Sequence, residues 1–275
     1  MTVRDGARFG ERLAEAVSRY GRLCVGIDPH PGLLAGWGLT DDPDGLDRFA
    51  MSCVEALAGH VAVVKPQSAF FERHGSAGIV VLERVLMALA GGPTLTLLDA
   101  KRGDIGSTMD GYADAYLAIG APLAADALTL SPYLGVGSLT PALDAATDAG
   151  RGAFVLARTS NPEGGQVQLA EWAGRSVAQA VVDAAAARNA EVAPLGDVGV
   201  VVGATNDHGL DLSRLNGAVL APGLGAQGAG PADIRARFAA VSGIVLPAAA
   251  RSVLSAGPDP LDVRAAAERL RDDLA

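Results

Sequence analysis

Asp99, Lys101 and Asp104 follow one short apolar segment in the sequence LLDAKRGDIGST, residues 97–108. Asp99 and Lys101 are two positions apart, and on a β-strand such side chains point to the same side. An ammonium beside carboxylates holds its proton more firmly, because nearby negative charge raises a lysine pKa. Such a lysine suits proton donation to a carbanion better than nucleophilic attack. A surface salt bridge, with Asp104 or Ser107 as a helix N-cap, explains the same residues without catalysis.

Polar residues follow three further apolar segments. Asp28 ends CVGIDPH, where an aspartate before proline also commonly starts a turn. Lys65 follows four apolar residues in VAVVKPQSAFFE, and a lysine that closes a buried strand is costly unless it is paired. Ser160 lies in the polar segment RTSNPEGG, which could cover a pocket or form an ordinary loop. These positions are candidate functional residues.

Apolar segments and helical patterns alternate along the chain. Helices are predicted over residues 7–20, 46–58, 78–90, 107–119, 139–148, 166–189, 207–215, 231–241 and 260–274. Strands are predicted over residues 23–27, 61–65, 94–99, 124–128, 153–157, 198–202, 218–221 and 244–247. This order predicts an α/β fold, a (β/α)8 TIM barrel, as a single domain over residues 1–275. A doubly wound open sheet is the alternative, but no Gly-x-Gly-x-x-Gly motif follows the first strand.

The last two predicted strands lead into residues suited to binding phosphate. APGLGAQG, residues 221–228, lets the backbone approach a ligand, and Pro231 and Asp233 begin the next helix. Arg251 follows the eighth strand, and a guanidinium matches phosphate oxygens in pairs. The loops after strands seven and eight often form a phosphate site in this fold.

Composition excludes several classes of protein. The net charge is −9 and no basic run occurs, which argues against nucleic-acid binding. No apolar run approaches the roughly 18 residues that a membrane helix needs, and we see no signal peptide. Cys24 and Cys53 have neither metal-ligand nor disulfide spacing, which leads us to expect a reduced cytoplasm. The four histidines share no spacing and are interpreted as structural; they are His30, His60, His74 and His208.

The motifs DAKRGDIGST, KPQSAFFE, GIDPH, APGLGAQG and the late Ala-Arg-Ser together resemble the orotidine 5′-phosphate decarboxylase family, particularly its longer bacterial branch. The resemblance extends from Arg22 to Val253, with the motifs in the family order. The Asp-x-Lys-x-x-Asp core is shared with related sugar-phosphate decarboxylases and synthases, so the other motifs supply the specificity. The resemblance implies decarboxylation of orotidine 5′-phosphate to uridine 5′-phosphate in pyrimidine biosynthesis. It also implies a cytoplasmic homodimer that uses neither metal nor cofactor.

The resemblance further implies specific roles for residues of this chain. The catalytic charge network would comprise Lys65, Asp99, Lys101 and Asp104, with Asp104 supplied by the other subunit. The implied substrate-binding residues are Asp28, Lys65, Ile105, Thr108, Ser160, Gln227 and Arg251. Asp28 and Lys65 would contact the ribose, Ser160 the pyrimidine, and the last two the phosphate. The partner's copies of the 105 and 108 side chains would lie near the base and the ribose.

Loss of CO₂ from orotidylate leaves a localised carbanion, because its lone pair cannot delocalise into an adjacent carbonyl. Lys101 would stabilise this charge and then protonate the same carbon. A magnesium-dependent enzyme acting on a sugar phosphate is an alternative, but it would need a further carboxylate where this chain has Lys65. A catalytically silent nucleotide-binding module is another, and it would need no Asp-Lys-Asp network.

Overall fold

Eight parallel strands form a closed barrel in a computed structural model that describes residues 6–205, 207–225 and 228–275. The strands are adjacent in the order β1-β10-β9-β8-β5-β4-β3-β2, which returns to β1. Their bounds are β1 (Cys24–Ile27), β2 (Val63–Pro66), β3 (Leu95–Arg102), β4 (Ala127–Leu130), β5 (Gly152–Arg158), β8 (Val198–Val202), β9 (Val219–Pro222) and β10 (Val245–Ala249). The predicted (β/α)8 barrel is confirmed, and the open-sheet alternative is wrong.

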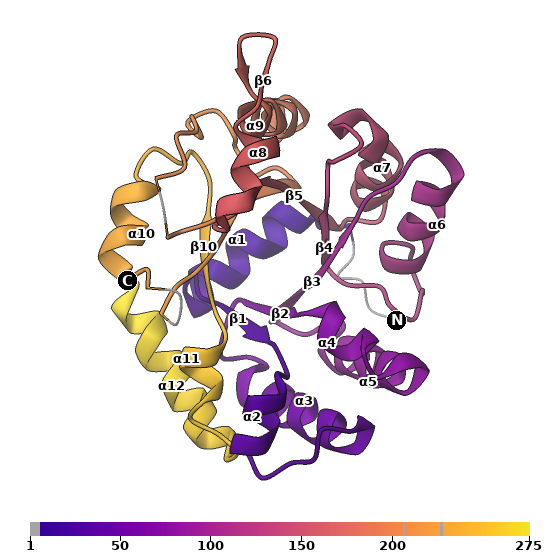
Figure 1. Cartoon of the computed structure of the whole chain (residues 1–275), viewed down its shortest axis with the longest axis vertical. Helices are drawn as coiled ribbons and strands as arrows, with labels where there is room; N and C mark the ends of the chain where they lie inside the picture. Colours follow the sequence, from indigo (N-terminus) through magenta and orange to yellow (C-terminus); the bar gives the residue numbers. More distant parts are fainter. Residues whose placement is uncertain (1–5, 206, 226–227) are drawn as a thin grey trace.

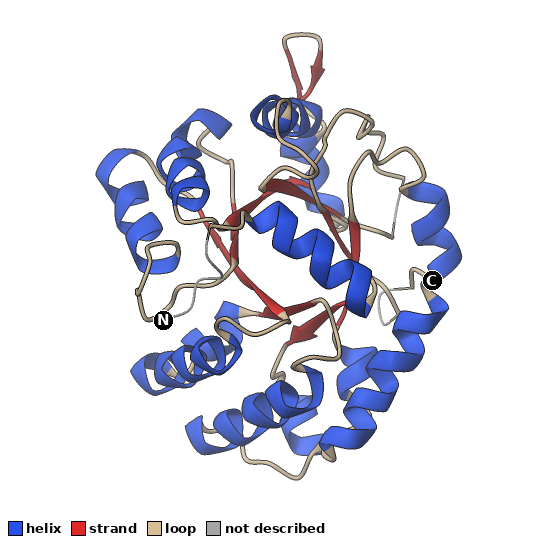
Figure 2. Ribbon diagram, turned by 180° about the vertical axis from the view of Figure 1, so that it is seen from behind, coloured by secondary structure: helices blue, strands red, loops and turns tan. Residues whose placement is uncertain are grey.

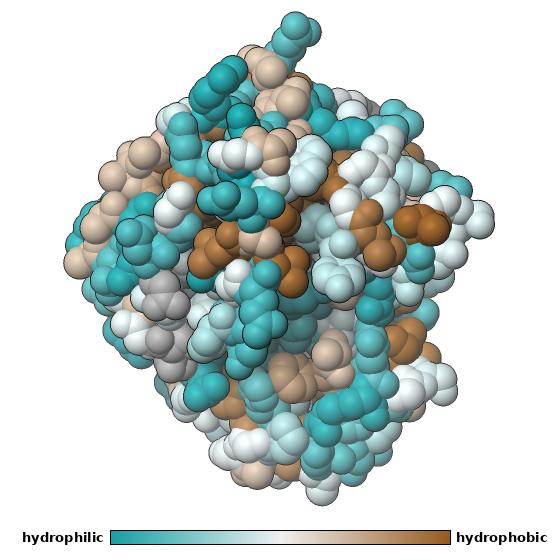
Figure 3. All heavy atoms as spheres, turned by 45° about the horizontal axis from the view of Figure 1, so that its top comes forward, coloured by the Kyte–Doolittle hydropathy of each residue, from teal (hydrophilic) through white to brown (hydrophobic). Residues whose placement is uncertain are grey.

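Helices surround the barrel and lie in the segments that connect its strands (Figures 1 and 2). The longer ones are α3 (Pro43–Leu57), α5 (Gly75–Leu89), α6 (Gly106–Tyr116), α7 (Thr140–Asp148), α9 (Val177–Asn189), α10 (Pro231–Arg237) and α12 (Pro260–Asp273). Short helical turns are α2 (Pro31–Gly36), α4 (Ser68–Glu72), η1 (Val136–Leu139), η2 (Pro162–Gly164), α8 (Gly165–Gln168) and α11 (Arg251–Leu254). None of the described helices is both long and apolar enough to cross a membrane. On the face shown in Figure 3, hydrophobic residues form separate groups among hydrophilic ones.

Helix α1 (Phe9–Tyr20) lies across the amino-terminal opening of the barrel (Figure 2). Phe9 packs edge-on against Phe154 of β5, with ring centroids 6.0 Å apart. The backbone N–H of Gly10 donates to Asp197 Oδ1 over 2.7 Å, just before β8 begins. This end of the barrel is therefore closed by apolar packing and by polar contacts to the start of the strands.

Strand side chains alternate between the barrel interior and the helix layer. Val63, Leu97 and Ala127 belong to the interior cluster that includes α1, whereas their neighbours Val64 and Leu98 pack in the outer layer under the helices. Two residues further along the same inward rows, the apolar side chains give way to polar ones. The strand period thus places a polar layer at the carboxyl end of the barrel.

The predicted helix over residues 166–189 is wrong in its first half. The chain instead forms α8 and then a two-stranded hairpin, β6 (Glu171–Trp172) with β7 (Arg175–Ser176), before α9 begins. Ala173 and Gly174 both have positive φ, at 51° and 79°, as a tight hairpin turn requires. The Ser176 side chain then accepts from the N–H of Gln179 and caps α9.

The predicted helix over residues 207–215 is also wrong. The described part of this segment, from Asp207 onward, is irregular, and its backbone amides donate to nearby side chains. Gly209 N donates to Asp207 Oδ1 over 3.2 Å, and Ser213 N donates to Asp211 Oδ1 over 2.9 Å. Short polar side chains compete with the helical backbone bonds in this way.

The two cysteines, Cys24 and Cys53, are free and buried. Burial raises the pKa of the Cys24 thiol to about 12, although Lys65 acts in the opposite direction. A thiol with so high a pKa is a weak nucleophile. Cys24 and Cys53 therefore act as small core residues.

Candidate active site

A cavity of about 350 Å³ opens at the carboxyl ends of the barrel strands. Its lining includes six of the residues that sequence analysis selected, which are Asp28, Lys65, Asp99, Lys101, Ser160 and Arg251. They come from segments spread over more than 200 positions of the chain. The barrel assembles them because the ends of parallel strands meet at one face.

A buried carboxylate, Asp99, holds two lysines at the centre of the cavity. Lys101 Nζ donates to Asp99 Oδ1 over 2.6 Å, and Lys65 Nζ donates to Asp99 Oδ2 over 3.1 Å. Lys65 Nζ also lies 3.3 Å from Gln67 Oε1 and 3.7 Å from Asp28 Oδ1. The Lys65 side chain is only 8% exposed, whereas that of Lys101 is 45% exposed toward the cavity mouth. The predicted proximity of Asp99 and Lys101 is confirmed.

Burial and charge act in opposite directions on this network. Burial raises the pKa of Asp99, but the positive charges of Lys65 and Lys101 outweigh it and lower the pKa to about 2. Burial lowers the pKa of Lys65, but Asp28 and Asp99 outweigh it, so the net shift is upward. At neutral pH the site therefore contains an ionised Asp99 beside a charged Lys65.

Thr129 of β4 completes the hydrogen bonding of Asp99. Its hydroxyl donates to Asp99 Oδ1 over 2.9 Å and accepts from the backbone N–H of Lys101, also over 2.9 Å. Gln67 contacts the same residue from the other side, since its Nε2 donates to the Asp99 carbonyl over 3.2 Å. Sequence reasoning missed both residues. The inward alternation from Ala127 to Thr129 is the signal that could have identified the threonine.

Asp28 lies beside Lys65 with acceptor capacity to spare. Its Oδ1 is buried and has no hydrogen-bond partner among the described residues. Gly26 precedes it on the same inward row, and a Cβ there would come within 3.0 Å of both Ala250 Cβ and Asp28 Oδ1. The glycine leaves room for this carboxylate, which can accept a hydrogen bond from a hydroxyl in the cavity.

Ser160 lies in a loop that other side chains hold in place. Gln168 of α8 accepts from the backbone N–H of Thr159 over 3.0 Å and donates to the Thr159 hydroxyl over 2.8 Å. A Cβ at Gly203 would come within 2.9 Å of the Ser160 backbone nitrogen, so a side chain there would displace the loop. Asn161 also lines the cavity. The RTSNPEGG segment is thus a cavity wall.

The other side of the cavity contains the glycine-rich loop and Arg251. Gly223 lines the cavity with φ of 119°, and Gly225 has φ of 77°, values that favour glycine. Arg251 begins α11, and its guanidinium makes no hydrogen bond or ion pair to the described residues. Gln227, the other implied phosphate ligand, lies outside the described residues. Helix α10 does not reach the cavity, and its Asp233 accepts from Gly230 N over 2.8 Å.

Three residues implied by the family resemblance lie outside this cavity in the single chain. Asp104 accepts from the adjacent Ile105 N over 2.8 Å and makes no ion pair with Lys101. The Ile105 side chain is 62% exposed, and Thr108 is exposed on α6. The chain itself therefore places these residues at the rim of the barrel.

The histidines fall into two groups. His30 lines the cavity, with its ring 4.2 Å from that of Phe70 between centroids, so its interpretation as purely structural is incomplete. The other three contact groups outside the site. His60 pairs with Glu268, His74 lies near Asp41, and His208 contacts the Arg237 carbonyl. The GIDPH motif therefore contributes a second wall residue besides Asp28.

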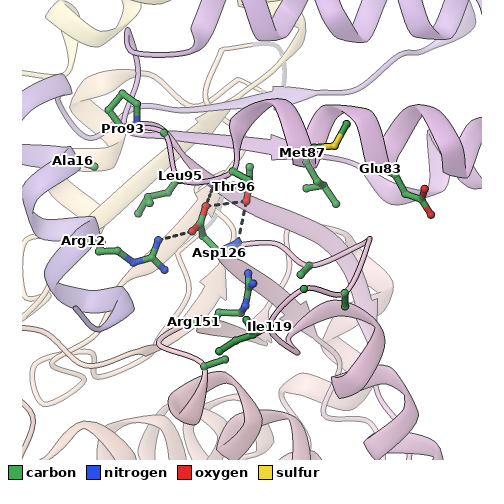
Figure 4. Close-up of a pocket in the computed structure, with 18 of the residues that line it drawn as sticks. Arg12, Ala16, Glu83, Met87, Pro93, Leu95, Thr96, Ile119, Asp126 and Arg151 are labelled. Carbon is green, nitrogen blue, oxygen red and sulfur yellow. Dashed lines mark hydrogen bonds and ion pairs between the residues drawn. The ribbon is translucent and has the colours of Figure 1, made fainter. Parts of the chain in front are cut away.

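A larger cavity, about 560 Å³, lies at the opposite, amino-terminal end of the barrel. Figure 4 shows Arg12 and Thr96 directed at Asp126 in this cavity. Arg12 also donates to the Gly150 carbonyl over 2.9 Å, and Arg151 donates to the Ala125 carbonyl. These cations are bound to the backbone that closes the barrel. The smaller cavity is the candidate active site, because its charged groups face open space.

A lysine–carboxylate network at the mouth of a (β/α)8 barrel is the arrangement of an acid–base enzyme. Residues 21–269 match the model of the orotidine 5′-phosphate decarboxylase / HUMPS family. The chain belongs to this family.

Similar proteins support the same assignment. An orotidine 5′-phosphate decarboxylase from Salinispora arenicola is 59% identical over 267 residues, which make up 96% of each chain. One from Streptomyces coelicolor is 55% identical over 95% of each chain. A crystal structure from Streptomyces avermitilis, assigned as an orotidine 5′-phosphate decarboxylase, has a TM-score of 0.93 and 53% identity, covering 98% of this chain and 95% of the other. The family expectation from the motifs is confirmed.

Proposed function

We propose that this protein decarboxylates orotidine 5′-phosphate to uridine 5′-phosphate in pyrimidine biosynthesis, with Lys101 as the general acid. The observation that carries the proposal is the Lys65–Asp99–Lys101 network, in which Lys101 Nζ lies 2.6 Å from Asp99 and opens onto the cavity. The family of the chain and the names of its relatives support the substrate.

The reaction requires one bond to break and one to form at the same carbon. The bond between C6 of the pyrimidine and its carboxylate breaks, CO₂ leaves, and the electron pair stays on C6. Lys101 Nζ then donates a proton to C6, and the neutral amine regains a proton from solvent. A fixed ammonium beside C6 stabilises the developing carbanion before that transfer. We propose that these steps need no metal or cofactor.

Asp99 and Lys65 keep this lysine in position. The carboxylate accepts from Lys101, Lys65 and Thr129 together, so it cannot turn away without leaving buried donors unsatisfied. It also lies where the substrate carboxylate would bind, and like-charge repulsion there would raise the energy of the bound ground state. We rank this below stabilisation of the carbanion, because the charged lysines offset the repulsion.

The remaining cavity residues would bind the nucleotide. Asp28 Oδ1 is buried without a partner among the described residues, and together with Lys65 it suits the ribose hydroxyls. Ser160 on the opposite wall suits the pyrimidine amide. Arg251, with Gln227, would hold the phosphate through charge-assisted hydrogen bonds. Binding of this remote group helps to order the reacting one.

We propose that two copies of the chain share their active sites. Asp104, Ile105 and Thr108 lie at the rim, outside the cavity of their own chain. Two apolar residues of the next loop are also exposed, Tyr133 at 77% and Leu134 at 52%. The two loops adjoin, because Ser131 N donates to the Arg102 carbonyl over 2.8 Å. An apolar rim beside unused site residues suits contact with a second copy.

We further propose that residues 1–275 form one catalytic domain and that the enzyme works in the cytoplasm. Both cysteines are free, which fits a reducing compartment.

The direct test follows the ultraviolet absorbance of orotidylate after addition of the purified protein. We expect the absorbance to fall as the pyrimidine loses its carboxylate, with equal rates in buffer and in excess chelator. A chelator-sensitive reaction on a sugar phosphate would instead support the magnesium-dependent alternative. Binding of the nucleotide without any change in absorbance would support the silent binding module.

Shared sites are tested by mixing two inactive variants. One site of a hybrid between Lys101→Ala and Asp104→Ala chains combines the native Lys101 of one chain with the native Asp104 of the other. We therefore expect activity to appear after the subunits exchange. Each variant incubated alone is the control. A mixture that exchanges subunits, as shown by mass spectrometry of the dimers, but stays inactive would contradict shared sites.

A further inference from the structure

Strand β3 is irregular where it carries the proposed catalytic residues. Leu98 pairs with Leu128 of β4, and the next pair is Arg102 with Leu130. Three residues of β3, from Asp99 to Lys101, therefore lie opposite the single residue Thr129. Such a bulge breaks the regular backbone pairing and changes the direction of the side chains within it.

Lys101 has a backbone conformation that costs energy. Its φ is 49°, in the left-handed region that side chains other than glycine seldom adopt. In this conformation its N–H does not bond to a backbone carbonyl of β4 but to the Thr129 hydroxyl, over 2.9 Å. A conformation of this kind persists only where surrounding contacts hold it.

The Thr129 hydroxyl joins both ends of the bulge. A hydroxyl has one donor and can accept as well, and here it accepts from Lys101 N while donating to Asp99 Oδ1. The same Asp99 oxygen accepts from Lys101 Nζ. The backbone and the ammonium of Lys101 are thus both tied to one pair of buried groups, since Thr129 is 1% and Asp99 7% exposed.

We propose that Thr129 is a positioning residue for the proton donor: its hydroxyl holds the β3 bulge in the form that directs Lys101 Nζ into the cavity. The inference deepens the proposed function and rests on it. Thr129 does not itself line the cavity, but it contacts Lys101 and Asp99, which do, so it acts through these two residues. Its specific contribution is therefore to turnover rather than to nucleotide affinity.

The chain contains a matched control at the other end of the barrel. Thr96 is likewise buried, at 3% exposure, and its hydroxyl accepts from Asp126 N over 2.9 Å while it donates to Asp126 Oδ2 over 3.0 Å. The two threonines thus make the same pair of contacts, an amide donor and a carboxylate acceptor. Thr96 precedes Lys101 by five residues on β3, and its hydroxyl contacts Asp126 rather than Lys101 or Asp99. Thr96→Val therefore measures the cost of losing such a hydroxyl in the barrel without removing a contact of the proton donor.

The experiment compares Thr129→Val, Thr129→Ser and Thr96→Val by steady-state kinetics with orotidylate. We expect Thr129→Val to lower kcat roughly 10- to 100-fold with little change in KM, because a small displacement of a reacting group has this effect. Thr129→Ser keeps the hydroxyl and should restore most of kcat. Thr96→Val should keep the native kcat even if it unfolds at a lower temperature. If Thr129→Val does not fold, Thr129→Ala serves in its place.

A crystal structure of the Thr129 variant gives a readout that does not depend on activity. We expect Lys101 to leave the left-handed region and its Nζ to move beyond hydrogen-bond distance of Asp99. Native kcat in Thr129→Val, or equally slow serine and valine variants, would overturn the inference while the proposed function stands. If the native chain does not decarboxylate orotidylate, the proposed function fails. The positioning role is tested separately, because it is overturned if Lys101 keeps its native position in the crystal structure of the variant.

Discussion

The two ends of the barrel contain similar clusters of charged and polar side chains, but the clusters serve different roles. At the amino-terminal end, Asp126 accepts from Arg12 and Thr96. At the carboxyl-terminal end, Asp99 accepts from Lys101, Lys65 and Thr129. Each site is therefore a carboxylate with cationic donors and one buried threonine. A cluster of this composition does not by itself indicate catalysis.

The two ends differ in the groups to which their arginine and lysine side chains donate hydrogen bonds. Arg12 and Arg151 donate to backbone carbonyls at the start of the barrel, and α1 lies over that opening. Lys101 makes its side-chain hydrogen bond to Asp99 and remains 45% exposed beside the cavity. Arginine also keeps its proton at any physiological pH, whereas a lysine can transfer one. The comparison indicates a structural role for the amino-terminal cluster and a catalytic role for the carboxyl-terminal one.

The largest expected effect is that of Lys101→Ala on turnover. Loss of both the proton donor and the fixed positive charge should lower kcat on the order of 10⁴-fold or more, while the fold survives because this side chain is half exposed. Lys101→Arg sharpens the test, because the guanidinium keeps the positive charge but does not release a proton. This variant should therefore be similarly inactive. Stopped assays with radiolabelled substrate measure the residual rate. Near-native turnover in either variant would remove Lys101 from the role of general acid.

Arg251→Ala should weaken handling of the phosphorylated substrate. A charge-assisted contact to phosphate contributes roughly 2–5 kcal/mol, so kcat/KM should fall roughly 30- to 5,000-fold. The side chain makes no polar contact to the described residues, which predicts an unchanged melting temperature. Orotidine without phosphate is the control substrate, and its slow turnover should be the same in both proteins. Equal kinetics with orotidylate would place Arg251 outside the site.

Arg12→Ala should destabilise the protein without affecting catalysis. The variant leaves the Asp126 carboxylate and the Gly150 carbonyl without this donor, which should lower the free energy of unfolding by about 2–3 kcal/mol. Urea denaturation measures the loss, and steady-state kinetics at 25 °C should give the native kcat. A large fall in kcat in the folded variant would show that the amino-terminal end contributes to the chemistry.

The smallest expected effect is a pH dependence of stability that comes from Asp99. Burial raises its pKa, but Lys65 and Lys101 outweigh it and lower the pKa to about 2 in the folded chain, against about 3.9 in the unfolded one. The unfolded chain therefore binds the proton first. The stabilisation by ionised Asp99 is complete above about pH 4 and is lost as the pH falls through about 2, a total of roughly 2 kcal/mol.

The measurement is the free energy of unfolding of the native chain and of Asp99→Asn between pH 7 and pH 3. The variant should be the less stable protein at pH 7, because the buried Lys65 loses the nearer of its two carboxylate partners and keeps the more distant Asp28. The difference between the two should narrow as the pH falls below 4. A constant difference over the whole range would show that Asp99 has no depressed pKa.

Local patterns in the sequence predicted the barrel and much of the site. Each predicted barrel strand overlaps one in the structure, because short apolar segments bounded by Gly, Pro or Asp are typical of buried parallel strands. The first half of one predicted helix and the whole of another are wrong, and in both cases the cause is local. Residues 166–189 and 207–215 have helical composition, but the positive φ of Ala173 and the side-chain acceptors Asp207 and Asp211 end or prevent the helix. Hydrophobic periodicity is averaged over many residues and therefore does not detect a single turn of this kind.

By itself, the sequence predicted that Asp99 and Lys101 would lie close together, because two positions at the end of a strand are neighbours along the chain. Only the tertiary structure decided how they meet. Lys65 reaches Asp99 from another strand, and Thr129 of a third strand holds the bulge that turns Lys101 toward the cavity. Strand register and buried hydrogen bonds depend on residues about 30 positions away, and such contacts exist only once the barrel has closed.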